Sequence, residues 1–139
     1  MDNLLPPHEI IDRMLAKDAF SQWLGIECLS IGPGYCTLKM TVRREMVNGF
    51  GVAHGGISFS FADSAFAFAS NSRGRHAVSV DTSINHLAPV MVGDVLTAKA
   101  VELHLGGRLA HYEVVICRAD GTKVALFKGM VYRKNDLWE

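Results

Sequence analysis

One acidic residue, Asp63, stands alone in the least charged part of the sequence, between Glu45 and Arg73. At helical spacing its neighbours include Phe59 and Phe66. A carboxylate in such an apolar setting is partly desolvated, which raises its pKa and makes the anion a stronger base or nucleophile. The alternative is a structural aspartate whose oxygens accept hydrogen bonds from backbone amides.

A second candidate for chemistry is the tripeptide His54-Gly55-Gly56, which precedes an apolar run. At the start of a helix the backbone N–H groups are unsatisfied and the macrodipole is positive. The glycines let a ligand approach these amides, so Gly55 and Gly56 could bind a carbonyl oxygen on which negative charge develops during acyl transfer. The same glycines could instead form only a tight entry turn.

Asn48 lies in the same glycine-rich loop, residues 48–56. Its amide could donate to a carbonyl oxygen or position a water molecule, although Asn-Gly in a loop is more often only a turn. The other histidines show no metal-ligand spacing: His8, His76, His86, His104 and His111. Nucleophile-elbow, P-loop and dinucleotide motifs are also absent from the sequence, so we expect no metal and no cofactor.

The element that must position Asp63 is a helix, predicted over residues 57–71. This run is too long for a strand, is apolar nearly all round, and ends before Arg73-Gly74. Phenylalanines on several faces require that other structure surround the helix. A curved sheet is the natural structure to enclose it.

Six β-type segments supply that sheet. Residues 24–31 and 35–42 flank a Gly-Pro-Gly turn, and the others are residues 76–87, 94–105, 109–118 and 122–133. Before them, the spacing of apolar residues predicts a short amphipathic helix that begins near Pro6-Pro7 and reaches Phe20. Short turns between the strands imply a mainly antiparallel sheet, so the fold class is α+β.

Composition limits the function classes. The 139 residues fit a single domain, residues 1–139, and the balance of 14 Lys and Arg against 14 Asp and Glu leaves no broad field for nucleic acid or anionic membrane. No segment qualifies as a membrane span. Three cysteines leave one thiol unpaired, and the N-terminus lacks a signal-peptide pattern, so we expect a cytoplasmic protein.

The motifs together are more specific than any one alone. The string Asn48-Gly49-x-x-x-x-His54-Gly55-Gly56, followed by residues 61–67 and 70–72, closely resembles the PaaI-type phenylacetate-pathway thioesterases of the hotdog superfamily. The resemblance covers nearly the whole chain, including residues 124–129. It implies a hotdog fold, in which an antiparallel sheet wraps a long central helix. It also implies dimers that often pair into tetramers, with active sites at the dimer interface.

The activity that this resemblance implies is hydrolysis of acyl-CoA thioesters, with phenylacetyl or hydroxyphenylacetyl groups favoured. By position, Asp63 matches the catalytic carboxylate, which attacks the thioester or activates water, and Gly55 matches the amide that polarises the carbonyl. Asn48 matches a residue that holds substrate or water, and His54 a neighbouring position that supports the loop. Ser79 falls where some relatives carry a water-orienting serine and others an alanine.

Coenzyme A, as part of substrate and product, needs cations for its phosphates. The candidates near loops or strand ends are Arg73, Arg75, Arg108 and Lys134, although each could equally be a solvated surface charge. One difference in sequence helps to choose between the branches of hotdog thioesterases: Ala67 stands four residues after Asp63. The 4-hydroxybenzoyl-CoA type from soil bacteria has a helical Glu with a Thr one turn later, which argues against that branch.

Two other functions compete with the thioesterase. A hotdog module could bind acyl-CoA without turnover. Hydration of enoyl-CoA would need a paired Asp and His acting on one water, and no His stands at close helical spacing from Asp63. Asp63 together with Asn48 and Gly55 favours the enzyme. We expect an obligate oligomer, because a sheet wrapped around one helix leaves an open edge and a loop site that the family completes with a second subunit. The resemblance implies that this oligomer is a homodimer or a homotetramer.

Overall fold

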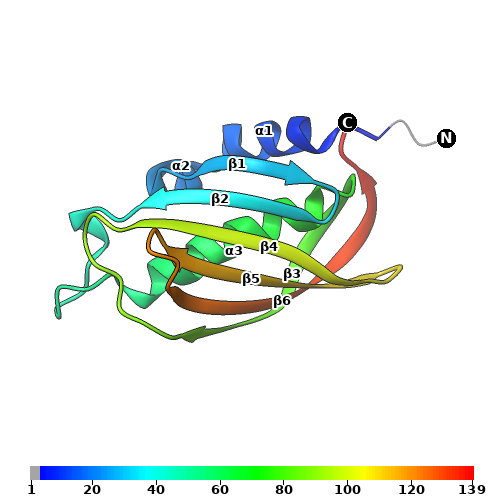
Figure 1. Ribbon diagram of the computed structural model, residues 1–139. Helices are drawn as coiled ribbons and strands as arrows, with labels where there is room; N and C mark the ends of the chain where they lie inside the picture. The colour runs from blue at the N-terminus through cyan, green and yellow to red at the C-terminus, as the bar shows by residue number, and fades with distance from the viewer. Residues whose placement is uncertain (1–3) are drawn as a thin grey trace.

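The computed structural model describes residues 4–139, and Figure 1 shows the order of its elements. Helices α1 (Pro7–Lys17) and α2 (Ala19–Leu24) precede strands β1 (Glu27–Gly32) and β2 (Tyr35–Thr41). A short 3-10 turn (Arg44–Met46) and a loop lead to the long helix α3 (Gly55–Asn71). Strands β3 (Arg75–His86), β4 (Val95–Leu105), β5 (Leu109–Arg118) and β6 (Lys123–Leu137) follow.

The six strands form one antiparallel sheet with the order β1-β2-β4-β5-β6-β3. The chain therefore crosses from β2 to the far edge to form β3, and returns through β4, β5 and β6. Helix α3 lies across the concave face of this sheet, as Figure 1 shows. The prediction of an α+β hotdog fold is confirmed.

Aromatic side chains fix α3 against the sheet. The buried Phe66 ring lies 5.8 Å from the Tyr112 ring and 5.5 Å from the Phe127 ring, in edge-to-face and tilted arrangements. Gly129 on β6 permits this approach, since a Cβ atom there would stand 2.6 Å from Phe66. The helix that carries Asp63 is therefore held rigidly at its centre.

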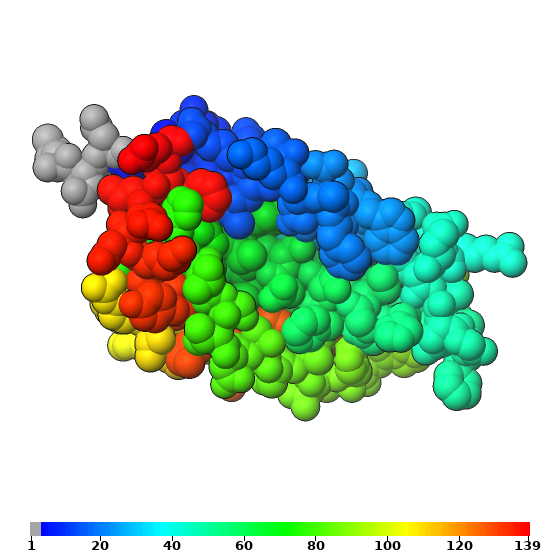
Figure 2. All heavy atoms as spheres, turned by 180° about the vertical axis from the view of Figure 1, so that it is seen from behind, coloured from blue at the N-terminus to red at the C-terminus, as the bar shows by residue number. Residues whose placement is uncertain are grey.

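Helix α3 is buried on most sides but keeps one open stripe. The positions that are not fully buried are Gly55, Gly56, Phe59, Ser60, Asp63 and Ala67. They recur every three or four residues and so lie on one face. In Figure 2 this part of α3 appears in green between the blue helices α1 and α2 and strand β3. The prediction of a helix buried nearly all round holds except on the stripe that carries Asp63.

The N-terminal helical region differs from its prediction. Asp18 ends α1 and caps α2, because its carboxylate accepts hydrogen bonds from the Ser21 N–H at 2.9 Å and the Ser21 hydroxyl at 2.6 Å. Gly25, with φ of 75°, then ends α2. The expected strand start at residue 24 is therefore wrong, and β1 begins at residue 27. At the other end of the chain, β6 continues to residue 137, four residues beyond the expected end.

Strand β3 forms an open edge of the sheet. It pairs only with β6, so its other side carries unpaired backbone groups. Its side chains Val78 and Val80 are 47% and 52% exposed. A long open edge with exposed valines is a template for pairing with another chain.

Two kinds of feature are not found in the part of the chain that the structure describes. Within residues 4–139 no helix is long and apolar enough to cross a membrane. The same residues contain no group of three His, Cys, Asp or Glu side chains arranged to hold a metal ion. Cys28, Cys36 and Cys117 are all free thiols.

Candidate active site

Asn48 organises the loop that precedes α3. Its side-chain Oδ1 accepts hydrogen bonds from the Phe50 N–H at 2.9 Å and the Val52 N–H at 3.4 Å, and its own N–H donates to the Val52 carbonyl at 2.8 Å. The side-chain Nδ2 donates no hydrogen bond within residues 4–139. The loop is thus held by the amide oxygen, and the amide nitrogen stays free to donate to a substrate or a water molecule.

The start of α3 leaves one backbone donor free. The Gly56 N–H donates to His54 Nδ1 at 2.9 Å, and the Ile57 N–H donates to the His54 carbonyl at 2.9 Å. The Gly55 N–H has no acceptor among the described residues. Of the predicted tripeptide, Gly55 therefore supplies the donor at the positive end of the helix dipole, and His54 supplies the cap.

Gly55 borders a surface cavity of about 370 Å³. The cavity is lined by residues 52, 53, 55, 58 and 86–90. It includes His86, the last residue of β3, whose ring lies against Gly55. The sequence offered no signal for this contact beyond the position of His86 near the end of a predicted strand. A carbonyl oxygen that reaches the Gly55 N–H would enter this cavity.

Asp63 lies two turns further along α3, on the open stripe. Burial raises the pKa of its carboxyl group, and the negative charge of Asp18 raises the pKa further. No N–H or O–H group of residues 4–139 donates to its oxygens, so the alternative of a structural aspartate held by backbone amides has no support within the described chain. Asp63 is a half-buried carboxylate with free lone pairs, as a base or nucleophile requires.

Gly55 and Asp63 of one chain are too far apart to act on one carbonyl group. Eight residues separate them along α3, which corresponds to a rise of about 12 Å. A reacting oxygen must stand about 3–3.5 Å from the carbon that it attacks. Within one chain, the structure therefore does not bring the Gly55 N–H and the Asp63 carboxylate together on one substrate group.

Ser79 lies on β3, on the side of the sheet that α3 covers. It is paired with Val131, a core residue, and residues directly opposite on neighbouring strands share a face. A β-bulge follows between Ser79 and Asp81, and Ser79 itself is exposed. Its hydroxyl is thus on the same side of the sheet as Asp63, and its water-orienting role stays a prediction.

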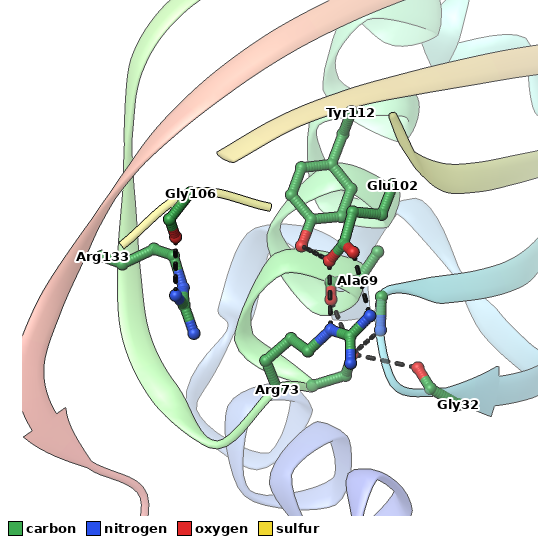
Figure 3. A network of polar contacts seen from close by, with 9 residues as sticks. Gly32, Ala69, Arg73, Glu102, Gly106, Tyr112 and Arg133 are labelled. Atoms are coloured by element: carbon green, nitrogen blue, oxygen red, sulfur yellow. Dashed lines mark hydrogen bonds and ion pairs between the residues drawn. The ribbon is translucent and has the colours of Figure 1, made fainter. Parts of the chain in front are cut away.

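Arg73 forms a network with Glu102 and Tyr112 at the end of α3, which Figure 3 shows. Its guanidinium donates to both carboxylate oxygens of Glu102, at 3.1 and 2.9 Å, and the Tyr112 hydroxyl donates to the same carboxylate at 2.9 Å. Burial alone raises the pKa of Glu102, but the hydrogen bonds from Arg73 and Tyr112 outweigh it and hold the pKa below its usual value. Arg73 is thus occupied within the chain.

The other three predicted phosphate ligands lie near the end of β6. Arg75 donates to the carbonyl groups of Gly107, Arg133 and Lys134, at 3.1, 3.1 and 2.7 Å. Arg108 donates to the Asn135 side chain at 2.7 Å, and the Lys134 ammonium stands 3.9 Å from Asp136. In Figure 1 the β4–β5 turn and the end of β6 lie opposite the loop that leads into α3. The phosphate contacts stay a prediction.

Glu102→Gln is expected to lower the free energy of unfolding near neutral pH by about 1–2 kcal/mol. The substitution removes the negative charge of the carboxylate to which Arg73 and Tyr112 donate their hydrogen bonds. The effect is modest because the Arg73 side chain is 34% exposed, so solvent partly screens the ion pair. A carboxyl group with a lowered pKa stabilises the fold above its unfolded value of 4.5, and this contribution is lost as the pH falls through the folded pKa. Denaturant unfolding at several pH values should show the difference shrinking below pH 4.5. A constant difference across that range would contradict the account.

Comparisons with known proteins show the family to which the fold belongs. The sequence model of the family described as the thioesterase superfamily matches residues 50–125. The acyl-coenzyme A thioesterase PaaI of Escherichia coli is 41% identical over 120 residues, which cover 86% of this chain and 86% of that protein. The solved structure of E. coli PaaI superposes with a TM-score of 0.92, covering 94% of this chain and 95% of that one at 37% identity.

A second relative is a variant of the phenylacetic acid degradation protein PaaI from Thermus thermophilus. Its structure has a TM-score of 0.81 at 39% identity and covers 84% of this chain and 100% of that one. The chain belongs to the thioesterase superfamily. Within that family its similarity is to the PaaI proteins, and the prediction of a PaaI-type thioesterase with the hotdog fold is confirmed.

Proposed function

We propose that this thioesterase hydrolyses acyl-CoA thioesters to the free acid and CoA, with phenylacetyl-CoA or hydroxyphenylacetyl-CoA preferred, as part of phenylacetate degradation in the cytoplasm. The observation that carries the proposal is the pair of unsatisfied groups on α3, the Gly55 N–H and the Asp63 carboxylate. The similarity to the E. coli acyl-coenzyme A thioesterase supports the CoA ester as substrate.

The proposed chemistry divides between these two groups. The thioester carbonyl oxygen accepts a hydrogen bond from the Gly55 N–H, where the helix dipole stabilises the developing negative charge. Asp63 either attacks the carbonyl carbon, forming an anhydride that water then hydrolyses, or takes a proton from a water that attacks directly. In both routes the carbon–sulfur bond breaks and the CoA thiolate leaves. The free Nδ2 of Asn48 is available to hold the substrate or the water.

A site of this kind needs two copies of the chain. Since Gly55 and Asp63 of one chain are about 12 Å apart along α3, Asp63 of one copy acts on a carbonyl held by Gly55 of the other. The free edge of β3 and the open stripe of α3 supply the surfaces for a homodimer, and dimers of this type pair into homotetramers. The alternative is a module that binds acyl-CoA without turnover. Such a module would not need Gly55 and Asp63 to act on the same carbonyl group.

Val80→Lys is expected to shift the protein toward monomer, because a lysine in the middle of the exposed β3 edge opposes strand pairing. Analytical ultracentrifugation checks this, with hydrolysis measured on the same samples. Leu29→Lys is the matched control, since Leu29 is 54% exposed on β1, the opposite edge strand. A wild-type monomer with full activity would refute the two-copy site.

The experiment that tests the function is release of free thiol from a panel of CoA esters: aryl-acetyl, benzoyl and straight-chain. We expect the highest kcat/KM for phenylacetyl or hydroxyphenylacetyl esters. Faster hydrolysis of another class of CoA ester would leave the thioesterase activity in place and change the preferred acyl group. Binding of every ester without thiol release would instead establish the non-catalytic module.

Among the four predicted cations, Arg108 and Lys134 are the proposed phosphate ligands to test first, because they are the less engaged pair. Arg73 donates two hydrogen bonds and Arg75 three within the chain, whereas Arg108 donates one and Lys134 has only an ion pair at 3.9 Å. Arg108→Gln and Lys134→Gln together are expected to raise KM for acyl-CoA about tenfold, with little effect on the matching pantetheine thioester, which lacks the nucleotide phosphates. Lys99→Gln on β4 combined with Lys123→Gln at the start of β6 serves as the control for loss of two exposed charges. Equal effects on the two substrates would remove these residues from the phosphate site.

A further inference from the structure

The ring of His86 lies directly over Gly55. A Cβ atom built on Gly55 would stand 3.2 Å from His86 Nε2 and 3.4 Å from its Cε1. In an α-helix the Cα–Cβ bonds tilt toward the N-terminus, which is also the direction in which the first N–H groups point. His86 therefore occupies the side of Gly55 from which a ligand reaches the free N–H.

His86 is held by its backbone but free at its side chain. It pairs with Ala125 in the β3–β6 ladder, and the following residue, Leu87, donates its N–H to the Val124 carbonyl at 2.8 Å. Neither ring nitrogen makes a hydrogen bond within residues 4–139. The ring borders the cavity of about 370 Å³ beside Gly55 and Ser58. A fixed strand thus presents an available imidazole nitrogen to the cavity.

We propose that His86 is a second hydrogen-bond donor to the thioester carbonyl oxygen, acting beside the Gly55 N–H. The inference rests on the proposed function, since it concerns the same carbonyl group. A neutral imidazole with its proton on Nε2 donates one hydrogen bond, and that bond strengthens as negative charge develops on the oxygen. The proton stays on the ring, so His86 changes neither the covalent steps nor their proton balance.

The opposing possibility is that the ring only fills the space left by the missing side chain of Gly55. Two substitutions separate these roles. His86→Phe keeps a planar ring of similar volume and removes the donor. His86→Gln gives up the ring and keeps an N–H donor. A donor role predicts that the Gln variant is the more active, and a filling role predicts that the Phe variant is.

The test measures kcat and KM of the wild type and both variants with the best thioester of the panel. It also measures the affinity for the thioether analogue in which a methylene group replaces the carbonyl. We expect His86→Phe to lower kcat about 10²-fold, as loss of one oxyanion donor does, and His86→Gln to recover part of that loss. Affinity for the thioether should change little in either variant, because the analogue has no carbonyl oxygen.

The outcomes distinguish this inference from the function on which it rests. Wild-type protein that hydrolyses no ester would overturn both. An active wild type with a near-normal kcat for His86→Phe would overturn only the role of His86. A loss of thioether affinity that matches the loss of kcat would also overturn it, since a filling role alters both. Thermal unfolding of each variant shows that the comparison is made on folded protein, and His86→Asn provides a smaller donor if the Gln variant does not fold.

Discussion

Asp63→Asn is expected to lower kcat for the preferred thioester by about 10²- to 10⁴-fold, while KM changes little. The substitution keeps the volume of the side chain and removes the anion. No group within the described chain donates to this carboxylate, so its loss breaks no internal hydrogen bond. A carboxyl group whose pKa is raised by folding destabilises the fold when it is ionised, so Tm at neutral pH should stay the same or rise.

The pH dependence of kcat/KM is a second measurement that tests the catalytic role of Asp63. Since the pKa of Asp63 lies above its usual value of 3.8, kcat/KM should fall on the acid side as Asp63 becomes protonated. Asp18→Asn is the matched variant, because asparagine also caps a helix while the neighbouring negative charge is lost. It should move the acid limb to lower pH at unchanged maximal rate. Hydrolysis by Asp63→Asn at close to the wild-type rate would show that the catalytic assignment is wrong.

Gly55→Val is the second substitution with a large expected effect, a loss of about 10²- to 10³-fold in kcat. Its Cβ atom would press on His86, and its branched side chain would cover the free N–H. The acid limb should stay in place, because Asp63 is untouched. Gly49→Ala is the control from the same loop, since a Cβ atom there meets nothing within 4 Å. A near-normal kcat for Gly55→Val would remove the Gly55 N–H from the mechanism.

The long helix and the strands could be predicted because their signals are local. The apolar run after Gly55-Gly56 is too long for a strand, and the glycine turns mark the strand ends. Helix α2 could not be predicted in the same way. The apolar pattern is continuous from α1 into α2, so it does not mark where α2 starts. The start is set by Asp18, whose role as a cap is seen only in the hydrogen bonds that Ser21 donates to its carboxylate.

The residue types of the candidate site could be predicted from the sequence. Which backbone amide is free and which face of α3 is exposed could not. Gly55 and Gly56 are equivalent in the sequence, and the cap from His54 Nδ1 to the Gly56 N–H decides which amide is free. The open stripe that exposes Asp63 depends on where α2 and β3 stop covering α3. Both are consequences of tertiary placement.

The other features that the sequence did not predict are contacts between residues far apart in the chain. Arg73 is a candidate phosphate ligand in the sequence, yet Glu102, which lies 29 residues away, binds its guanidinium. His86 stands over Gly55 only because β3 runs along the edge of the sheet and ends at the start of α3. No spacing rule relates these residues, so nothing in the sequence alone joins them.

The central claim, that Asp63 of one copy acts with Gly55 of its partner, is tested most directly by complementation. Asp63→Asn and Gly55→Val chains are coexpressed with different affinity tags, and the heterodimer is isolated and assayed beside each inactive homodimer. One of its two sites then combines an intact Asp63 with an intact Gly55, so the account predicts about half of the wild-type activity per dimer. If each site lay within one chain, no site would be intact, and a heterodimer as inactive as its parents would contradict the account.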